Sequence, residues 1–385
     1  MVRHHGGSGG EAVSAVKSCI KRVFPGNNTP QGFYSFYHEI LPPDATRVFV
    51  IKGGPGVGKS TFMQNIARDL FALGYATEIH HCSSDNNSID GVVFPQLGIG
   101  IVDGTWPHVM DPRAPGAVDE IVWLGQFWDE QSVRAHKREI LALQKELELL
   151  FARAYRYLKA AQVVYEDWES VNTQALDFGK ANLLAQQVVE ENFSGLPVAR
   201  KAGRVRHLFA SAITPDGMVN YLDTIVGNCS RRYVIEGDPG TGKSYLLEKV
   251  SRAAVERGFY VELYHCPLNP EKVEHVLIPG LSLALTKSIE PHTFTPRPDD
   301  TIVDMNQCLD MDVVEKHYAS VTRASEAFSN LFNTAIHYIQ QAKAHHDVLE
   351  GFYTPHVDFE GIDRLRRQIV ERILEYAKEN GAIRE

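Results

Sequence analysis

The sequence lacks any long uninterrupted apolar run. Its 385 residues are 44% hydrophobic and 23% charged, but no stretch approaches the roughly 20 apolar residues that a membrane-spanning helix needs. An excess of positive charge is also absent, because 48 acidic residues outnumber 39 Lys and Arg to give a net charge of −9. Broad nucleic-acid-binding surfaces depend on clustered Lys and Arg. The composition therefore argues against a membrane and against nucleic acid as partners.

Cysteine is scarce as well. The five cysteines are Cys19, Cys82, Cys229, Cys266 and Cys308. They are odd in number, widely separated and without a CxxC pair, which argues against a disulfide scaffold or a zinc ribbon. The reducing cytoplasm is therefore the expected compartment. The first residues, MVRHHGGSGGEAVS, also lack the apolar segment of a secretory signal.

What the sequence does contain is an internal repeat. A shift of 184 residues aligns a long series of identities without a gap. The aligned pairs include Val50 with Val234, Gly53 with Gly237, the Pro55-Gly56 and Gly58-Lys59-Ser60 groups with Pro239-Gly240 and Gly242-Lys243-Ser244, His81-Cys82 with His265-Cys266, and Pro112-Arg113 with Pro296-Arg297. Such a repeat indicates two copies of one structural unit.

The repeat extends beyond this central stretch. A shift of 185 pairs Phe24 with Phe209, and a shift of 181 pairs Tyr157 with Tyr338 in the helical tails. The segment GLPVARKAGR near residue 200 has linker composition. We therefore expect a flexible lead over 1–20, a first domain over 21–200 and a second over 201–385, with the two halves forming an intramolecular pseudo-dimer.

Periodicity predicts strand, glycine loop and helix in each half. The β-branched run 47–52 enters a glycine loop, residues 61–73 have helical spacing, and two further strands are expected over 75–82 and 97–102. The corresponding elements of the second half are 232–236, 245–257, 260–266 and 281–285. Alternation of strands and helices predicts an α/β fold with a parallel sheet flanked by helices.

Two stretches differ from this pattern. Residues 128–192 and 312–347 are rich in Leu, Ala, Tyr and Glu and almost free of Gly and Pro. They are expected to form a helical hairpin appended to each core. A solvated face over a packed seam is the simplest interpretation of their mixed charges; a lid or an arm that docks a protein partner is the alternative.

Each glycine loop satisfies the pattern G-x-x-x-x-G-K-[ST]. Glycines let backbone N–H groups converge on phosphate oxygens, and the following helix points its positive N-terminal end at the same anion. Lys59 and Lys243 are expected to reach the β- and γ-phosphates of ATP. The residues predicted to bind nucleotide are Gly53, Gly54, Pro55, Gly56, Val57, Gly58, Lys59, Ser60 and Thr61, then Gly237, Asp238, Pro239, Gly240, Thr241, Gly242, Lys243, Ser244 and Tyr245, and also Arg297.

A metal ion needs further oxygen ligands. Ser60 and Ser244 supply hydroxyls suited to Mg²⁺, and Asp103, which ends the apolar run 97–102, suits the acidic position of an ATPase. The alternative for Asp103 is a turn residue before a glycine. At the corresponding position the second half has Lys287, which as an ammonium cannot ligate Mg²⁺. The two sites are therefore expected to be unequal, unless Asp304 or Glu290 substitutes.

Two further side-chain types are candidates for chemistry. Asp85 follows the second predicted strand, where it could act as a base toward an acceptor hydroxyl; an Asx turn within a Ser- and Asn-rich run is the competing interpretation. Arg113 and Arg297 stand in matching Pro-Arg pairs and could neutralise γ-phosphate charge, in cis or from the other half. Solvated loop arginines are the commoner case.

These motifs resemble a family of bacterial proteins of this length that carry two P-loop NTPase domains in tandem. The resemblance rests on the stretches FPGNNTPQGF, GGPGVGKST, HCSSDNNSIDGVV, IVDGTWPH and GDPGTGKS and covers nearly the whole chain after residue 20. It implies ATP binding and a cytoplasmic, ATPase-like role. It implies no substrate beyond the nucleotide.

Three hypotheses follow for function. The first is a Mg²⁺-ATP-binding NTPase in which Lys59, Ser60 and Asp103 carry hydrolysis while Lys243 and Ser244 mainly bind. The second is a kinase that phosphorylates a small metabolite with Asp85 as base and a helical arm as lid. The third is a nucleotide-dependent switch without enzymatic activity, whose helical arms engage a protein partner.

Overall fold

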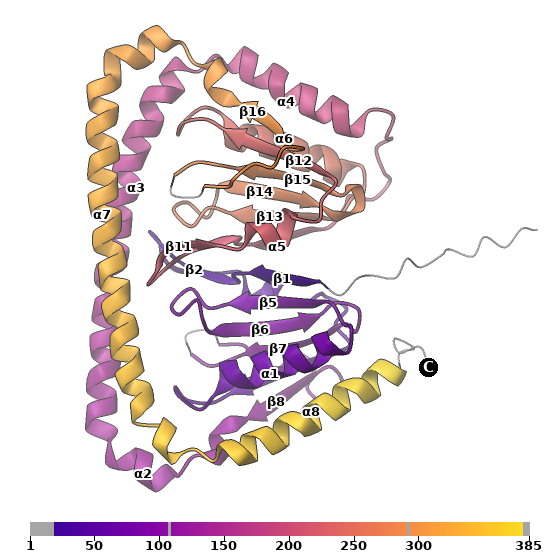
Figure 1. Cartoon of the computed structure of the whole chain (residues 1–385), viewed down its shortest axis with the longest axis vertical. Coiled ribbons are helices and arrows are strands. Elements are labelled where there is room, and N and C mark those ends of the chain that lie inside the picture. Colours follow the sequence, from indigo (N-terminus) through magenta and orange to yellow (C-terminus); the bar gives the residue numbers. More distant parts are fainter. Residues whose placement is uncertain (1–18, 107–108, 291–292, 380–385) are drawn as a thin grey trace, which may run out of the picture.

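The computed structural model describes residues 19–106, 109–290 and 293–379. Two six-stranded sheets form the cores, and helices flank them (Figure 1). The first sheet has the order β1 (Ile20–Val23), β5 (Thr77–His81), β6 (Ile89–Phe94), β7 (Ile99–Asp103), β4 (Arg47–Lys52) and β8 (Asp119–Trp123). The second has β16 (Thr301–Asp304), β12 (Arg231–Glu236), β15 (Leu283–Lys287), β14 (Val273–Ile278), β13 (Val261–His265) and β9 (Val205–Leu208). The two strand orders are the same when one is read backwards, as a duplication requires.

The prediction of a parallel sheet is wrong in one strand of each half. β6 is antiparallel to both β5 and β7, and β14 is antiparallel to both β13 and β15. The sheets are therefore mixed. Short connections on either side of β6 explain the difference, since antiparallel neighbours need only a tight turn, whereas parallel neighbours need a crossover.

The helices after the glycine loops agree with prediction. α1 (Lys59–Ala72) and α6 (Lys243–Glu256) each begin directly after a glycine in the left-handed conformation, Gly58 and Gly242. One face of each helix is buried against its sheet, including Phe62 and Ile66 in α1.

The predicted helical hairpins are not formed within each half. The arm of the first half is one long helix, α3 (Lys137–Ala175), preceded by the short α2 (Glu130–Ala135), and it packs against the long helix α7 (Met311–Gly351) of the second half. Figure 1 shows these two helices running side by side in opposite directions along one edge of the molecule. Tyr157 and Tyr338, which the repeat pairs, stack with ring centroids 5.5 Å apart.

The final helix of each half crosses to the other core. α4 (Phe178–Phe193) follows α3 but buries Ala185, Val188 and other residues in the core of the second sheet. α8 (Phe359–Glu379) follows α7 but buries Ile369 and Ile373 in the core of the first sheet. Each packed core therefore contains a helix from the other half of the sequence, which the division at residue 200 does not reveal.

Replacing Ile373 by alanine is expected to destabilise the first core by about 2–5 kcal/mol, because Ile373 is fully buried there and truncation leaves a cavity. Urea unfolding measures the loss, and hydrogen exchange should locate it in β4 and α1. Glu371→Ala on the exposed side of α8 is the matched control and should change stability by no more than about 0.5 kcal/mol. Faster hydrogen exchange confined to β12 and α6 would contradict the packing of α8 in the first core.

The two halves meet around a pseudo-two-fold axis. Phe24 and Phe209, paired by the repeat, exchange backbone hydrogen bonds of 2.9 and 3.0 Å, which is the reciprocity of an isologous interface. Beside them lie two hairpins, β2 (Gly26–Thr29) with β3 (Gly32–Ser35) and β10 (Ser211–Thr214) with β11 (Gly217–Asn220). The Asn27 side-chain amide bridges them, donating to Ser211 O and accepting from Ile213 N.

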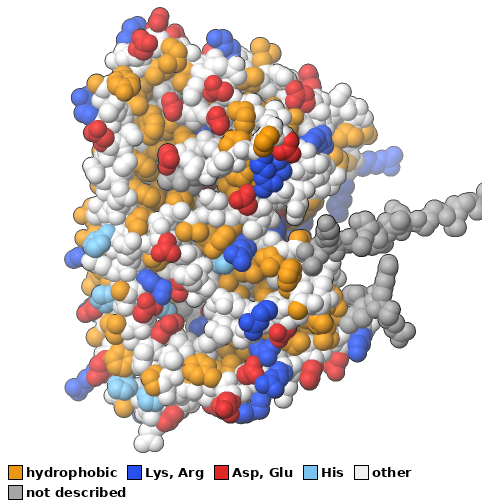
Figure 2. Space-filling view, in the orientation of Figure 1, with side chains coloured by type: hydrophobic (Ala, Val, Ile, Leu, Met, Phe, Trp, Pro, Cys, Tyr) orange, Lys and Arg blue, Asp and Glu red, His pale blue; other side chains and the backbone are white. Residues whose placement is uncertain are grey.

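Smaller elements complete the chain. They are η1 (Tyr37–Glu39), η2 (Leu124–Phe127), α5 (Leu222–Val226), η3 (Pro279–Leu281), η4 (Met305–Cys308) and η5 (Thr354–His356). Within the described ranges, the helices are too short or too polar to cross a lipid bilayer. Figure 2 shows acidic and basic side chains interspersed over the displayed face.

Candidate functional site

The two glycine loops lie at the ends of equivalent strands. The first loop (residues 53–60) connects β4 to α1, and the second loop (237–244) connects β12 to α6. Asp103 pairs in register with Ile51 of β4, and Lys287 pairs with Ile235 of β12. Asp103 and Lys287, which the repeat aligns, therefore occupy equivalent positions in the two sheets.

The first loop gathers the groups expected for nucleotide chemistry. Lys59 Nζ donates to the carbonyl oxygens of Gly53 and Gly54 at 3.1 and 2.9 Å, and it lies 3.6 Å from Asp103 Oδ2. The other carboxylate oxygen of Asp103 accepts from Thr105 N. Ser60 Oγ accepts from Ile89 N at 3.0 Å. A hydroxyl and a carboxylate beside a helix N-terminus are the donor set that Mg²⁺ prefers, so the residues present fit this ion.

The second loop holds a different set. Lys243 Nζ donates to the carbonyl oxygens of Gly237 and Asp238, both at 2.5 Å. Lys287 Nζ donates to Ser244 Oγ at 2.8 Å, so an ammonium contacts the hydroxyl that was expected to hold Mg²⁺. Of the acids considered as substitutes, Asp304 ends β16 beside Glu236, the residue before the second loop, but its Oδ1 accepts from Asn306 N. Glu290 is exposed. Beside Ser244 the second loop thus places an ammonium where the first loop has a carboxylate, which disfavours Mg²⁺ at that position.

Lys243 of the second loop and Lys287 of β15 have lower pKa values than ordinary surface lysines. Burial, and then the charge of Lys287, lowers the pKa of Lys243 to about 7. Burial also lowers the pKa of Lys287, against the attraction of Glu274. An anion bound between these two lysines would stabilise their charged forms.

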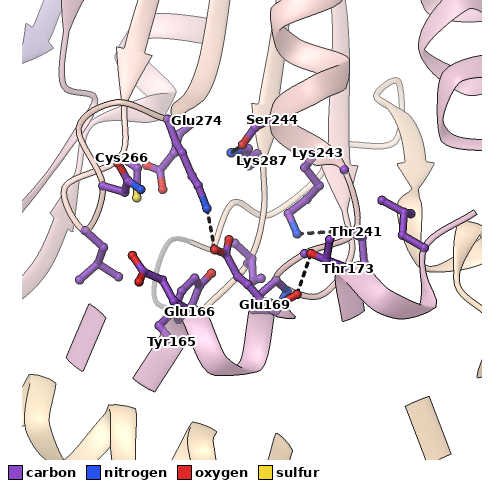
Figure 3. A pocket seen from close by; sticks show the side chains of 18 of the residues that line it. Tyr165, Glu166, Glu169, Thr173, Thr241, Lys243, Ser244, Cys266, Glu274 and Lys287 are labelled. Carbon is purple, nitrogen blue, oxygen red and sulfur yellow. Dashed lines mark hydrogen bonds and ion pairs between the residues drawn. The ribbon is translucent and has the colours of Figure 1, made fainter. Parts of the chain in front are cut away.

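A cavity of about 240 Å³ opens over the second loop. Its floor is the loop with Lys243 and Lys287, and its wall is α3, which the first half supplies. In Figure 3 Tyr165, Glu166 and Glu169 of α3 lie across the cavity from these lysines. Glu169 Oε2 pairs with Lys272 Nζ at 2.6 Å.

The first loop is covered in the same way by the second half. Gly56 N donates to Glu350 Oε1 of α7 at 3.3 Å, and Gly54 lies against the ring of Tyr353 from the second half and that of Trp128 from the first. Glu350 and Glu169 correspond under the 181-residue shift. Each arm helix therefore ends on the glycine loop of the other half.

This cover gives Gly56 and Gly240 a second role. A Cβ on Gly240 would lie 2.3 Å from Glu169 O, and one on Gly56 would lie 2.8 Å from Glu350 O. Both glycines also have positive φ, +85° and +66°. The sequence motif explains these glycines by phosphate binding alone. In the structure they also allow the arm of the other half to approach the loop closely.

The remaining candidates lie apart from the loops or are engaged. Asp85 accepts from Asn87 N and Ser88 Oγ, as in an Asx turn, and lies 3.4 Å from Lys343 of α7. Arg113 is exposed. Arg297 donates to Asp223 Oδ1 in the first turn of α5 and to the O atom of Gly227, which follows that helix. The structure does not bring either arginine to a glycine loop through any contact among the described residues.

The flanking residues of the motifs also differ. Thr61 is exposed on α1, whereas Tyr245 donates from its hydroxyl to Asn182 of α4 at 2.8 Å. Sequence reasoning missed the arm residues that face the loops, Glu169 and Glu350, and also Lys272, which lies between β13 and β14 and pairs with Glu169. The 181-residue shift that pairs Glu169 with Glu350 was the available signal.

Comparison with family models, with curated protein sequences and with solved structures finds no match for this chain. The site must therefore be interpreted from its own geometry.

Proposed function

We propose that this chain is an ATP-binding NTPase that hydrolyses ATP with Mg²⁺ at the first glycine loop and uses the second loop for binding. The observation that carries the proposal is the convergence of Lys59, Ser60 and Asp103 at the N-terminus of α1, with Asp103 Oδ2 3.6 Å from Lys59 Nζ. The backbone N–H groups of the loop and the helix end favour a polyphosphate at this point.

Each residue has a distinct task in this proposal. Lys59, which now donates to loop carbonyls, turns toward the β- and γ-phosphates and neutralises charge that develops during transfer. Ser60 and Asp103 would hold Mg²⁺, which when bound neutralises phosphate charge and aligns the phosphate chain. Asp103 also keeps Lys59 close to the loop before nucleotide arrives.

The arms provide a route for communication between the loops. Because Glu350 accepts from Gly56 N, a phosphate that takes this N–H must displace a carboxylate at the end of α7. Glu169, the counterpart of Glu350, lines the cavity at the second loop. Occupancy of one loop is therefore expected to move the arm that the other half supplies.

Lys59→Ala is expected to lower phosphate release from ATP by about 100- to 1,000-fold, because it removes a charge that stabilises the transition state. Lys243→Ala, the matched control at the second loop, should retain turnover and lose one binding equivalent of nucleotide. Phosphate release and equilibrium dialysis measure the two quantities.

The other outcomes separate the competing functions. Equal loss of turnover in both variants would contradict unequal sites. Negligible release that rises sharply with one added metabolite would favour the kinase, and binding without either activity would favour the switch. Unchanged nucleotide affinity in both variants would refute nucleotide binding at the loops.

A further inference from the structure

The second loop carries a positive charge where the first carries a negative one. Lys287 stands at the strand position of Asp103, and its ammonium lies 2.8 Å from Ser244 Oγ. At the first loop, the counterpart hydroxyl of Ser60 accepts a backbone N–H instead. The exchange of Asp for Lys is therefore accompanied by a specific contact to the serine of the loop.

This arrangement places a cation next to the serine without a metal. An ammonium is a compact charge with three N–H donors, so Lys287 can donate to Ser244 and to a phosphate oxygen at the same time. Mg²⁺ in a nucleotide site also joins a serine hydroxyl to phosphate oxygens. The lysine thus reproduces the charge and the bridging contact, although not the coordination geometry.

Three lysines and three glutamates line the cavity over the second loop. Lys243 and Lys287 are 6% and 7% exposed, and both line the same cavity of about 240 Å³. A third lysine, Lys272, is paired with Glu169 across the opening. Glu274 also lines the cavity. Buried cations require a compensating charge. Glu274 supplies part of it at Lys287, and the phosphate groups of a nucleotide would add to it next to the backbone N–H groups of the loop.

The loops that follow β5 and β13 also differ in their acidic residues. Asn269 stands where the first half has Asp85, and Lys287 stands where it has Asp103, whereas Glu274 keeps the acidic character of Asp90. At the first loop Asp103 lies beside Lys59, whereas at the second loop Lys287 adds an ammonium beside Ser244.

We propose that the second glycine loop binds the phosphate chain of a nucleotide without a divalent cation, with the Lys287 ammonium in the place of Mg²⁺. This inference rests on the proposed nucleotide binding and adds the ionic form of the ligand. It also explains why this site binds without hydrolysis, since no metal is held there to activate the γ-phosphate.

The test uses the full chain with Lys59→Ala, which restricts binding to the second loop. Calorimetric titration with ATP in EDTA is expected to show one site per chain, with affinity changed little by Mg²⁺. Adding Lys287→Met, which keeps the length of the side chain without its charge, should lower affinity in EDTA by about 10- to 100-fold. Lys287→Asp should lower it similarly in EDTA but recover affinity when Mg²⁺ is added.

The chain with Lys243→Ala, which leaves only the first loop, is the matched control and should bind ATP only with Mg²⁺. Circular dichroism and thermal unfolding establish whether each variant is folded. If Lys287→Met is not folded, Lys287→Gln takes its place as the variant without the charge. Binding at the second loop that requires Mg²⁺ would overturn the inference while leaving the proposed function intact. Absence of nucleotide binding at both loops, with and without Mg²⁺, would overturn both.

Discussion

Replacing Arg206 by leucine is expected to lower the free energy of unfolding by about 3–5 kcal/mol, because it leaves buried carboxylates without their main partner. Arg206 on β9 binds both oxygens of Glu78 on β5, at 2.6 and 3.0 Å, and donates to Glu39 O and Ile40 O. Its side chain is 10% exposed and that of Glu78 6%. One arginine thus joins an edge strand of the second half to the sheet of the first.

A symmetric counterpart completes this network. Lys21 on β1 donates to Glu262 on β13 at 2.6 Å and lies 3.1 Å from Glu78. The repeat pairs Lys21 with Arg206 and Glu78 with Glu262. Burial opposes ionisation of Glu78, yet Arg206 and Lys21 hold its pKa well below the ordinary value. The network therefore consists of ionised groups, and removal of one cation leaves unbalanced buried charge.

Urea denaturation measures the effect of Arg206→Leu. Arg204→Leu is the matched control, because Arg204 is 40% exposed on the same segment and its ion pair with Glu39 spans 3.8 Å; it should cost less than about 1 kcal/mol. Combining Arg206→Leu with Glu78→Leu should cost less than the sum of the single changes, since it removes the stranded carboxylate. A loss under about 1 kcal/mol in Arg206→Leu would show that the network contributes little to the interface.

Lowering the pH from 7 to 5 is expected to reduce the free energy of unfolding by about 4 kcal/mol, about 2 from each of two buried histidines. Burial, and then the positive charges of Arg22 and His80, lowers the pKa of His81 to about 4 from 6.5, although a hydrogen bond to Asn86 O opposes the shift. Burial and then His207 lower the pKa of His265 to about 4 as well.

The direction of this pH effect on stability follows from proton binding. Between pH 6.5 and about 4 the unfolded chain binds protons at these positions and the folded chain does not, so stability is fully present above pH 6.5 and is lost as the pH falls toward 4. His265 Nδ1 contacts Pro270 O at 2.6 Å, and its Nε2 lies 2.8 Å from His207 Nδ1. Nδ1 therefore donates to Pro270 O and Nε2 accepts from His207, and protonation of His265 would remove that acceptor.

Denaturation series at pH 7, 6 and 5 test this dependence. Gln at both positions keeps a donor for the loop carbonyl but has no titration in this range, so His81→Gln with His265→Gln should flatten the profile. A wild-type profile that stays level from pH 7 to 5 would contradict the prediction.

Local patterns predicted the elements around each loop because their signals are contained in short stretches. The β-branched run of β4, the glycines after it and the amphipathic spacing of α1 lie in consecutive sequence, and the observed β4 (Arg47–Lys52) has the predicted bounds. β6 escaped detection because its apolar residues follow a Ser- and Asn-rich turn and its buried Asp90 and Gly91 interrupt the pattern. Its direction depends on pairing with two neighbours, which local periodicity does not encode.

The sequence alone determined the duplication, the two glycine loops and the inequality between Asp103 and Lys287, because identity and spacing are properties of the linear chain. Tertiary structure decided what covers each loop and which core receives each terminal helix. α3 and α7 each bury apolar residues at helical spacing over part of their length, such as Ala154, Leu158 and Ala161 in α3, so each could have folded back within its own half or packed against the other. Only burial of complementary faces, with α4 on the second core and α8 on the first, selects the exchanged arrangement.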